Sequence, residues 1–399
     1  MERMDALMLP LNWQRVRLGD ICEFGNGGAY ETLIVENGDF KLISLNSIDI
    51  DGNLKNTMKR VNFYDNSLKQ DDIVMVLSDV AHGDFLGLCA VIPSNDYVLN
   101  QRMGRLRIRN DCINILFLRL YINANQKYFK MQGQGSSQLN LSKKAIEDFE
   151  IPLPPLNEQI AIANILSDVD HYLYSLRALI LKKESVKKAL SFELLSQRKR
   201  LKGFNQAWQR VRLGDICEFG NGGAYETLIV ENGDFKLISL NSIDIDGNLK
   251  NTMKRVNFYD NSLKQDDIVM VLSDVAHGDF LGLCAVIPSN DYVLNQRMGR
   301  LRIRNDCINI LFLRLYINAN QKYFKMQGQG SSQLNLSKKA IEDFEILLPP
   351  LNEQIAIANI LSALDNEIIS LKNKKRQFEN IKKALNHDLM SAKIRVLKK

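Results

Sequence analysis

The strongest constraint on this chain is an internal repeat. Residues Trp13 to Ile151 return without a change as Trp208 to Ile346, an offset of 195 positions, and the first substitution afterwards is Leu347 in place of Pro152. A period this long is typical of duplicated domains, because solenoid repeats run to roughly 20 to 50 residues. With 399 residues the chain has room for two hydrophobic cores. The sequence therefore predicts two globular copies of one fold.

Composition limits the class of protein. Hydrophobic residues make up 45% and charged residues 25%, as in ordinary globular proteins. No apolar run approaches the roughly 18 to 20 residues that span a bilayer, and the N-terminus lacks the basic and apolar regions of a signal peptide. We therefore expect a cytoplasmic protein. The six cysteines form no CxxC pair and there are four histidines, so we expect reduced thiols, no disulfide framework and no zinc module.

Positive charge is concentrated outside the repeated block. Each copy carries 16 basic and 17 acidic residues, so the rest of the chain holds 20 of the 52 basic and 12 of the 46 acidic residues. The segments between and after the copies are therefore where nonspecific attraction to a polyanion would originate.

Each repeat consists of a globular segment and a long helical segment. Strand-like runs separated by glycine turns, followed by a helix-like stretch over residues 113–131, predict a mixed α and β fold. The expected strands are Val16 to Phe24, Phe40 to Leu45, Ile73 to Leu77, Leu86 to Ile92 and Arg105 to Arg109. We place the globular segments at residues 1–151 and 204–346, and the helical segments at residues 152–203 and 347–399.

Prolines fix the start of each helical segment. The run PLPPLNEQ begins at Pro152, and proline is compatible with the first turn of a helix but not with its interior. Apolar residues then follow at heptad spacing, which predicts that the two helices pack against each other as spacers between the globular copies. These residues are Ile162, Leu166, Val169, Leu173, Leu176 and Ile180, then Ile357, Leu361, Leu364, Ile368, Leu371, Phe378, Ile381, Leu385 and Leu389.

Common catalytic signatures are missing from the sequence. There is no GxxxxGK[ST], no DPPY or NPPY quartet, no FxGxG loop, no HExxH and no GxSxG motif. The run GNGG from Gly25 lacks the lysine and the following helix of a phosphate-binding loop, which favours a turn. His82 lies between acidic residues, but a polar loop between strands explains this segment better than acid-base catalysis. We therefore expect no catalytic residue and no metal ligand.

A basic strand offers one set of candidate contacts to nucleic acid. Alternation along a strand sends Arg105, Arg107 and Arg109 to one face, and guanidinium groups suit phosphates and guanine edges. A solvated strand face balanced by nearby carboxylates is an equal alternative.

A polar loop over residues 132–144 offers a second set. Its glutamine, asparagine and serine side chains can pair with bases or phosphates. An ordinary turn followed by a helix capped by Ser142 is the simpler interpretation of the same residues.

Four features occur twice and in the same order. They are WxxVxLGDI from Trp13, GSSQLNLS from Gly135, PLPPLNEQI from Pro152 and a long helix; the second proline run differs in one residue, LLPPLNEQI from Leu347. In this combination the chain resembles the specificity subunits of type I restriction-modification systems, over nearly its whole length.

The resemblance implies an α+β fold. Two mixed α/β target-recognition domains, at residues 1–151 and 204–346, would stand in a pseudo-two-fold arrangement, joined by two long antiparallel helices that form a coiled coil. It also implies a prokaryotic, non-catalytic subunit that binds double-stranded DNA and no membrane. Such subunits dock two adenine-N6 methyltransferase subunits and, through them, motor-nuclease restriction subunits. No cofactor would bind this chain, because the partners use S-adenosylmethionine and ATP with Mg.

The identity of the two copies adds an expectation. Antiparallel helices relate two identical heads by an approximate two-fold axis, and a two-fold protein reads an inverted repeat. We therefore expect an interrupted palindrome with half-sites about 10 bp apart, centre to centre. As base-reading residues we select polar side chains on predicted loops and exposed strand faces. They are Asn26, Tyr30, Asn46, His82, Arg102, Arg105 and Gln138, with the equivalents Asn221, Tyr225, Asn241, His277, Arg297, Arg300 and Gln333.

Two other functions fit parts of the pattern. A stand-alone two-headed DNA-binding regulator would bind its site tightly without enzyme partners. A helical scaffold would bind proteins and no DNA, and the near-zero net charge of each copy favours it. A stand-alone methyltransferase is disfavoured by the missing cofactor motifs.

Overall fold

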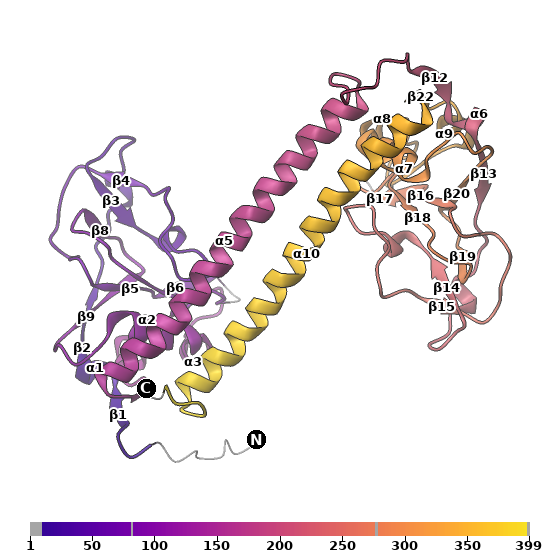
Figure 1. Ribbon diagram of the computed structural model, residues 1–399. Coiled ribbons are helices and arrows are strands. Elements are labelled where there is room, and N and C mark those ends of the chain that lie inside the picture. Colours follow the sequence, from indigo (N-terminus) through magenta and orange to yellow (C-terminus); the bar gives the residue numbers. More distant parts are fainter. Residues whose placement is uncertain (1–9, 81–82, 276–277, 397–399) are drawn as a thin grey trace. The chain divides into compact units, whose positions relative to one another are not determined.

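The computed structural model describes residues 10–80, 83–275 and 278–396. It divides into two compact units, residues 1–177 with 374–399 (unit 1) and residues 178–373 (unit 2) (Figure 1). Each unit joins one globular head to parts of two long helices. The elements of head 1 are β1 (Gln14–Arg17), α1 (Leu18–Ile21), β2 (Cys22–Asn26), η1 (Glu31–Leu33), β3 (Phe40–Ile43), η2 (Leu45–Ser47), β4 (Arg60–Val61), β5 (Ile73–Val76), β6 (Ser78–Val80), β7 (Cys89–Val91), β8 (Tyr97–Leu99), β9 (Met103–Ile108), α2 (Ile115–Ala124), α3 (Gln126–Gln132), β10 (Gln138–Asn140), α4 (Lys143–Glu147) and β11 (Glu150–Leu153).

Head 2 repeats the same elements 195 positions later. They are β12 (Gln209–Arg212), α6 (Leu213–Ile216), β13 (Cys217–Asn221), η3 (Glu226–Leu228), β14 (Phe235–Ile238), η4 (Leu240–Ser242), β15 (Arg255–Val256), β16 (Ile268–Val271), β17 (Ser273–Val275), β18 (Cys284–Val286), β19 (Tyr292–Leu294), β20 (Met298–Ile303), α7 (Ile310–Ala319), α8 (Gln321–Gln327), β21 (Gln333–Asn335), α9 (Lys338–Glu342) and β22 (Glu345–Leu348).

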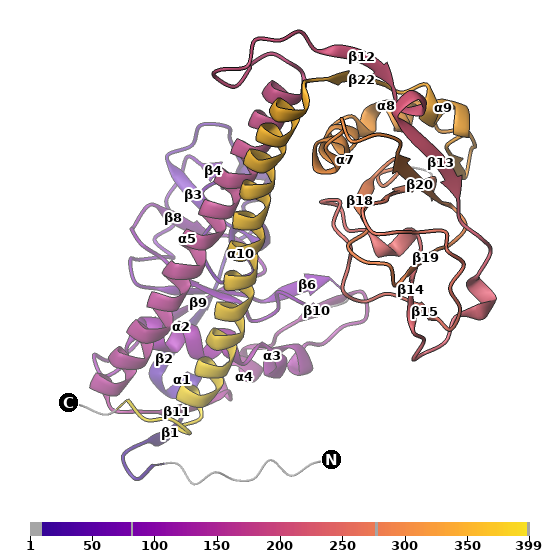
Figure 2. The ribbon, with the colours of Figure 1, turned by 45° about the vertical axis from the view of Figure 1, so that its right-hand side comes forward.

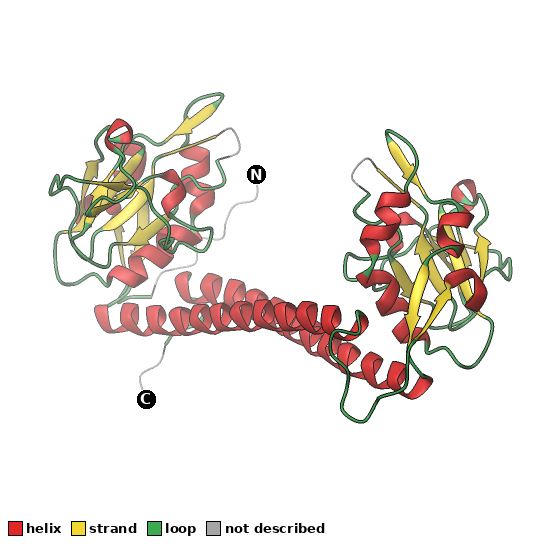
Figure 3. Ribbon diagram, turned by 90° about the horizontal axis from the view of Figure 1, so that it is seen from above, coloured by secondary structure: helices red, strands yellow, loops and turns green. Residues whose placement is uncertain are grey.

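A four-stranded antiparallel sheet in the order β2-β9-β5-β7 forms the centre of head 1. Its strand β5 is buried on both faces. Ile73 and Met75 belong to the core cluster that includes helix α2, and Val74 and Val76 belong to the cluster on the other face. Successive side chains of a strand point to opposite faces, so an unbroken apolar run is required here. In Figure 3 the short helices of each head lie against its strands.

Three smaller sheets complete each head. Strand β3 pairs with β4 and, in parallel, with β8, which gives a three-stranded sheet. Strand β1 pairs with β11, so the start and the end of the head are joined. Strands β6 and β10 form a two-stranded ribbon, which Figure 2 shows reaching out from the body of head 1. The predicted mixture of α and β structure is confirmed.

Two of the expected elements are interrupted. The run from Val16 to Phe24 is not one strand, because Leu18 and Ile21 are both buried and a short helix, α1, turns them to the same side. The helix expected over residues 113–131 is divided at Asn125 into α2 and α3. The cap at Ser142 is confirmed, since its Oγ accepts a hydrogen bond from the Ala145 amide at 3.2 Å.

The two long helices are α5 (Leu156–Leu195) and α10 (Leu351–Met390), each of 40 residues. Most residues of the predicted apolar stripe are buried, including Leu166 and Leu173 in α5. Ile381 departs from the prediction, because its side chain is 45% exposed. The stripe therefore packs as heptad spacing predicts, except at Ile381, and it is buried again at Leu389.

Within each unit the two helices run antiparallel. In unit 1, Lys382 near the end of α10 forms an ion pair of 2.5 Å with Asp170 in the first half of α5. In unit 2, Lys183 in the second half of α5 forms an ion pair of 2.8 Å with Glu367 in the first half of α10. The antiparallel pairing that the resemblance implies is confirmed.

A buried carboxylate ties the start of each long helix to its head. In unit 1, Glu158 accepts a hydrogen bond from Trp13 Nε1 at 3.2 Å and two from Arg395, at 2.7 and 2.8 Å. Arg395 follows α10 and Trp13 precedes β1, so both ends of the described chain meet at this carboxylate. The equivalent groups of unit 2 are Glu353, Trp208 and Arg200.

The compact units do not follow the segments proposed from the sequence. Those segments separated heads from helices, whereas each unit combines a head with parts of both helices. The boundaries at residues 151, 203 and 346 stay a prediction. All six cysteines are free; Cys112 and Cys307 are exposed and the other four are buried.

Candidate nucleic-acid interface

A hollow of about 290 Å³ lies on the surface of head 1. Asn46 from η2, Arg102 from the turn before β9 and Gln138 from β10 all line it, so the fold brings together three residues selected from the sequence. The other lining residues are Leu45, Ile48, Lys55, Val76, Ser78, Asp79, Val80 and Phe85. Head 2 contains the equivalent hollow, of about 280 Å³, with Asn241, Arg297 and Gln333.

Three polar side chains of this hollow have no partner within the described part of the chain. Asn46, Lys55 and Arg102 are exposed and form no hydrogen bond or ion pair there. Because all three are exposed, water can satisfy their hydrogen-bonding groups in the free protein. Donors that converge on a concave surface in this way remain available to a polar ligand.

The backbone of Arg102 supports the same interpretation. Its φ is +67°, and φ is +66° at the equivalent Arg297. A left-handed conformation costs a residue other than glycine roughly 1 to 2 kcal/mol. The carbonyl of Arg102 accepts a hydrogen bond of 2.9 Å from the Leu77 amide, which holds the turn between β8 and β9 in place. Strain of this kind is often kept at functional sites.

Arg105 lies elsewhere and is occupied. Its guanidinium forms an ion pair of 2.5 Å with Glu23 and donates a hydrogen bond of 3.1 Å to the carbonyl of Ser67, and only 13% of its side chain is exposed. Arg107 binds Asp72 through two hydrogen bonds of 2.8 and 2.6 Å. The alternative of a strand face balanced by carboxylates therefore describes these two arginines better than a row available for DNA. This argues against base contact by Arg105 and by Arg300, whose guanidinium binds Glu218 and Ser262 in the same way.

The remaining selected residues are not at the hollow. Asn26 is exposed at the end of β2. The ring of Tyr30 packs edge-on against Phe63, with 4.6 Å between the centroids, and desolvation together with a hydrogen bond to Asp65 raises the pKa of its hydroxyl. Asn221 and Tyr225 occupy the equivalent places in head 2, where the Tyr225 hydroxyl binds Asp260 at 2.9 Å. His82 and His277 lie outside the described residues.

Most residues that line the hollow were not selected from the sequence, and three of them have exposed side chains. Lys55, Val80 and Phe85 all lie on or beside loops, and none belongs to a recognisable motif. Lys55 follows the Asp51-Gly52 turn. Residues beside a turn usually lie on the surface, so the turn could have indicated that this lysine is exposed. An exposed valine on a strand carries no such signal, because apolar strand residues usually face a core.

A family model described as "Type I restriction modification DNA specificity domain" matches residues 10–184 and, a second time, residues 205–380. The chain belongs to this family. The resemblance inferred from the repeated motifs is therefore confirmed, and the protein is a specificity subunit of a type I restriction-modification system.

Known specificity subunits match along the whole chain. The type I restriction enzyme MjaVIII specificity subunit of Methanocaldococcus jannaschii is 27% identical, over 99% of this chain and 96% of the relative. The crystal structure of the S subunit from M. genitalium covers 98% of both chains with a TM-score of 0.66 and 18% identity. A chain from a structure on the complex assembly and conformational transition of the type I R-M system covers 96% of this chain and 98% of its own, with a TM-score of 0.56 and 17% identity. At these identities the two structures support the shared fold.

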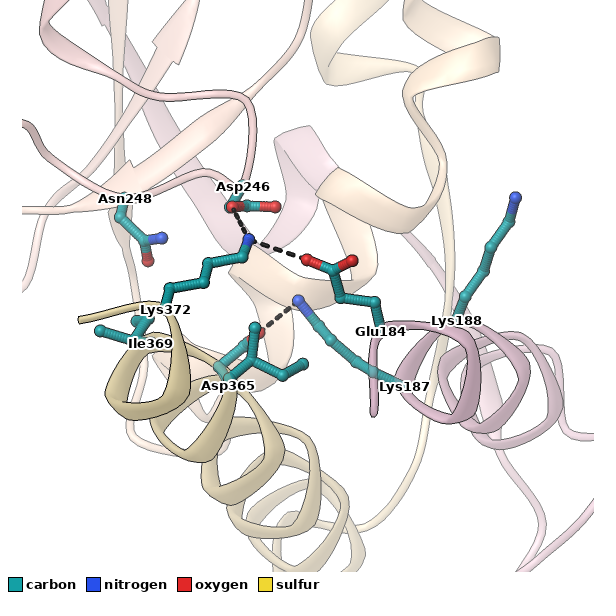
Figure 4. Close-up of a pocket in the computed structure, with 9 residues that line it drawn as sticks. Glu184, Lys187, Lys188, Asp246, Asn248, Asp365, Ile369 and Lys372 are labelled. Atoms are coloured by element: carbon teal, nitrogen blue, oxygen red, sulfur yellow. Dashed lines mark hydrogen bonds and ion pairs between the residues drawn. The ribbon is translucent and has the colours of Figure 1, made fainter. Parts of the chain in front are cut away.

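A second hollow of this specificity subunit lies within unit 2, where α5, α10 and the loop that carries Asp246 meet (Figure 4). Its volume is about 420 Å³. Lys372 contacts Glu184 at 2.9 Å and Asp246 at 3.4 Å, and Lys187 pairs with Asp365 (Figure 4). Carboxylates therefore neutralise the charges of Lys187 and Lys372. We interpret the hollow as a junction between head 2 and the helices and not as a site that binds an anion.

Removing this junction contact should have a small effect. Lys372→Ala is expected to lower the free energy of unfolding by less than about 1 kcal/mol, because both of its ion pairs are exposed to solvent and screened. Thermal unfolding at low and high salt would measure it, with Lys188→Ala on the same hollow as the control. A loss of several kcal/mol would show that the junction is a major link of head 2 to its helices.

Two negative findings concern the part of the chain that the structure covers. Among the helices described there, none combines the length and the hydropathy that crossing a bilayer requires. No cluster of three or more His, Cys, Asp or Glu side chains suited to a metal ion occurs among those residues.

Proposed function

We propose that this subunit reads the DNA target of its complex, and that each head binds one half of a bipartite site in double-stranded DNA through the hollow. The observation that carries the proposal is the convergence of Asn46, Lys55 and Arg102, which have no partner among the described residues. An arginine can bind a guanine edge through two hydrogen bonds, and an asparagine can do the same with adenine. A lysine beside them suits the phosphate backbone, which fixes position and supplies most of the affinity.

The subunit would contribute no catalytic group. In this proposal it docks two adenine-N6 methyltransferase subunits, and through them motor-nuclease restriction subunits. The partners would bind S-adenosylmethionine and use ATP with Mg. The family supports this division of labour, and the absence of catalytic motifs from the sequence agrees with it.

The two halves of the target should be identical. Residues 13–151 and 208–346 have the same sequence, and so the same side chains line both hollows. Antiparallel helices favour an inverted arrangement of the half-sites. We therefore propose an interrupted palindrome with half-sites about 10 bp apart, centre to centre.

The test is to co-express the chain with the methyltransferase subunit of its own system and map N6-methyladenine across the genome. We expect methylation of both strands within one interrupted palindrome. An asymmetric bipartite site would retain the DNA-reading function and contradict the inverted arrangement. No methylation with a demonstrably active partner would contradict the function itself. Tight site-specific binding by the isolated chain would then favour a DNA-binding regulator, and no DNA binding would favour a helical scaffold.

A further inference from the structure

The ribbon of β6 and β10 places an apolar and an amide side chain directly opposite each other. Val80 pairs with Gln138, and Ser78 pairs with Asn140, in an antiparallel register. Because side chains alternate along a strand, all four lie on one face of the ribbon. Directly opposed residues hold their Cβ atoms about 5 Å apart.

Val80 is unusually exposed for a strand valine. Its exposed fraction is 70%, and that of its equivalent Val275 is 71%. Other strand valines of head 1, such as Val74 and Val76, are fully or almost fully buried. Packing against the described residues therefore does not account for Val80, which also lines the hollow that contains Arg102.

The residues around Val80 are held in place. Ser78 donates a hydrogen bond of 2.6 Å to the Asn140 side chain across the ribbon. The Asp79 carboxylate accepts hydrogen bonds of 2.8 Å from the amides of Val80 and Phe85. Strand pairing and these hydrogen bonds fix the backbone from Ser78 to Val80, which suits a recognition contact.

Gln138 retains hydrogen-bonding capacity toward solvent. In head 1 its amide nitrogen makes one long contact of 3.4 Å with Asn140 Oδ1, and its equivalent Gln333 makes no side-chain hydrogen bond to the described residues. A glutamine amide can both accept from and donate to the edge of adenine in the major groove. The partner base of adenine is thymine, whose 5-methyl group is an apolar contact in the same groove.

We propose that the pair Val80–Gln138, and Val275–Gln333 in head 2, reads one A·T base pair in the major groove of each half-site. Gln138 binds N6 and N7 of the adenine, and Val80 packs against the 5-methyl group of the thymine. The major groove admits a two-stranded ribbon. The exposed cations Lys55 and Arg102 line the same hollow as the pair and complement the charge of DNA. This inference rests on the proposed function and names two residues and the base pair that they recognise.

The experiment uses the full chain in complex with its methyltransferase subunit and duplexes that carry the mapped target. Each thymine of the half-site is replaced in turn by deoxyuridine, which lacks the 5-methyl group, and each adenine by 7-deazaadenine, which lacks N7. Affinity is compared between the wild-type chain, Val80→Ala with Val275→Ala, and Gln138→Ala with Gln333→Ala. The control is Val35→Ala with Val230→Ala, at valines that are 37% exposed and lie away from the hollow.

At one base pair we expect both analogues to weaken wild-type binding. Deoxyuridine should cost about fourfold per half-site, the effect of one buried methyl group, and 7-deazaadenine about tenfold. The valine variant should no longer respond to deoxyuridine there, and the glutamine variant should no longer respond to 7-deazaadenine. The control variant should respond as the wild-type chain does.

Two results would overturn the inference while leaving the DNA-reading function intact. One is a mapped half-site at which wild-type binding ignores every deoxyuridine substitution. The other is an unchanged response to both analogues in the variants. If the wild-type complex bound the mapped target no more tightly than a scrambled duplex, the proposed function on which the inference rests would be contradicted.

Discussion

Arg102→Gly combined with Arg297→Gly should greatly weaken recognition of the target without destabilising the heads. A bidentate contact to a base is worth about 1 to 3 kcal/mol, so discrimination should fall by roughly 5- to 150-fold in each half-site. Binding isotherms on the mapped target and on a scrambled duplex, at several salt concentrations, would separate lost specificity from lost charge.

Most substitutions lower the free energy of unfolding. We do not expect Arg102→Gly with Arg297→Gly to lower it. Both arginines have a left-handed backbone, with φ of +67° and +66°. Glycine relieves a strain of roughly 1 to 2 kcal/mol but orders a more flexible chain, at roughly 0.5 to 1 kcal/mol. The free energy of unfolding should therefore stay the same or rise by up to about 1.5 kcal/mol per head.

Two controls accompany this experiment. Asn66→Gly with Asn261→Gly changes another left-handed position, φ +57° in both heads, and should leave target preference unchanged. Arg105→Ala with Arg300→Ala removes an ion-paired arginine of the neighbouring strand and should also leave it unchanged. If Arg102→Gly kept the full preference for the target, or if Arg105→Ala abolished it, the assignment of the hollow as the reading surface would be wrong.

Asp72→Ala combined with Asp267→Ala should produce the largest loss of stability. The Asp72 side chain is 3% exposed, binds Arg107 through two hydrogen bonds, and accepts a third, of 2.7 Å, from the Lys69 amide. The guanidinium of Arg107 stays charged when its partner is removed, because arginine is not deprotonated in proteins. An unpaired charge in this setting costs about 3 kcal/mol, at the lower end of the range because Arg107 is partly exposed.

Chemical denaturation followed by circular dichroism would measure this loss. A matched variant removes both charges in each head, with Arg107→Met and Asp72→Leu and the same changes at Arg302 and Asp267. It should recover most of the stability, because it leaves no buried charge without a partner. Equal instability of the two variants would mean that the hydrogen bond from the Lys69 amide to Asp72, which both variants lose, matters more than the ion pair. Target preference of the folded fraction should be unaffected in both variants.

The sequence by itself determined the architecture of this protein to a large degree. The unchanged repeat from Trp13 to Ile151 requires two heads with one fold. The heptad spacing from Ile162 to Ile180, and again from Ile357 to Leu371, predicts two long helices with a shared apolar seam. Such periodic patterns can be read from a sequence because they depend on local geometry, namely 3.6 residues per helical turn and two per strand repeat. The motifs that repeat in order were specific enough to indicate the family.

Only the tertiary structure decided which polar residues are available to bind. Arg102 and Arg105 lie three positions apart in one basic stretch, yet the first is exposed and unpaired among the described residues and the second is held by Glu23 and Ser67. Glu23 lies 82 positions from Arg105 and Ser67 lies 38. Val80 owes its place beside Gln138, 58 residues further along the chain, to the pairing of β6 with β10. Whether a side chain is available to bind depends on partners that are distant in sequence and meet only when the strands pair. A local sequence pattern therefore cannot predict it.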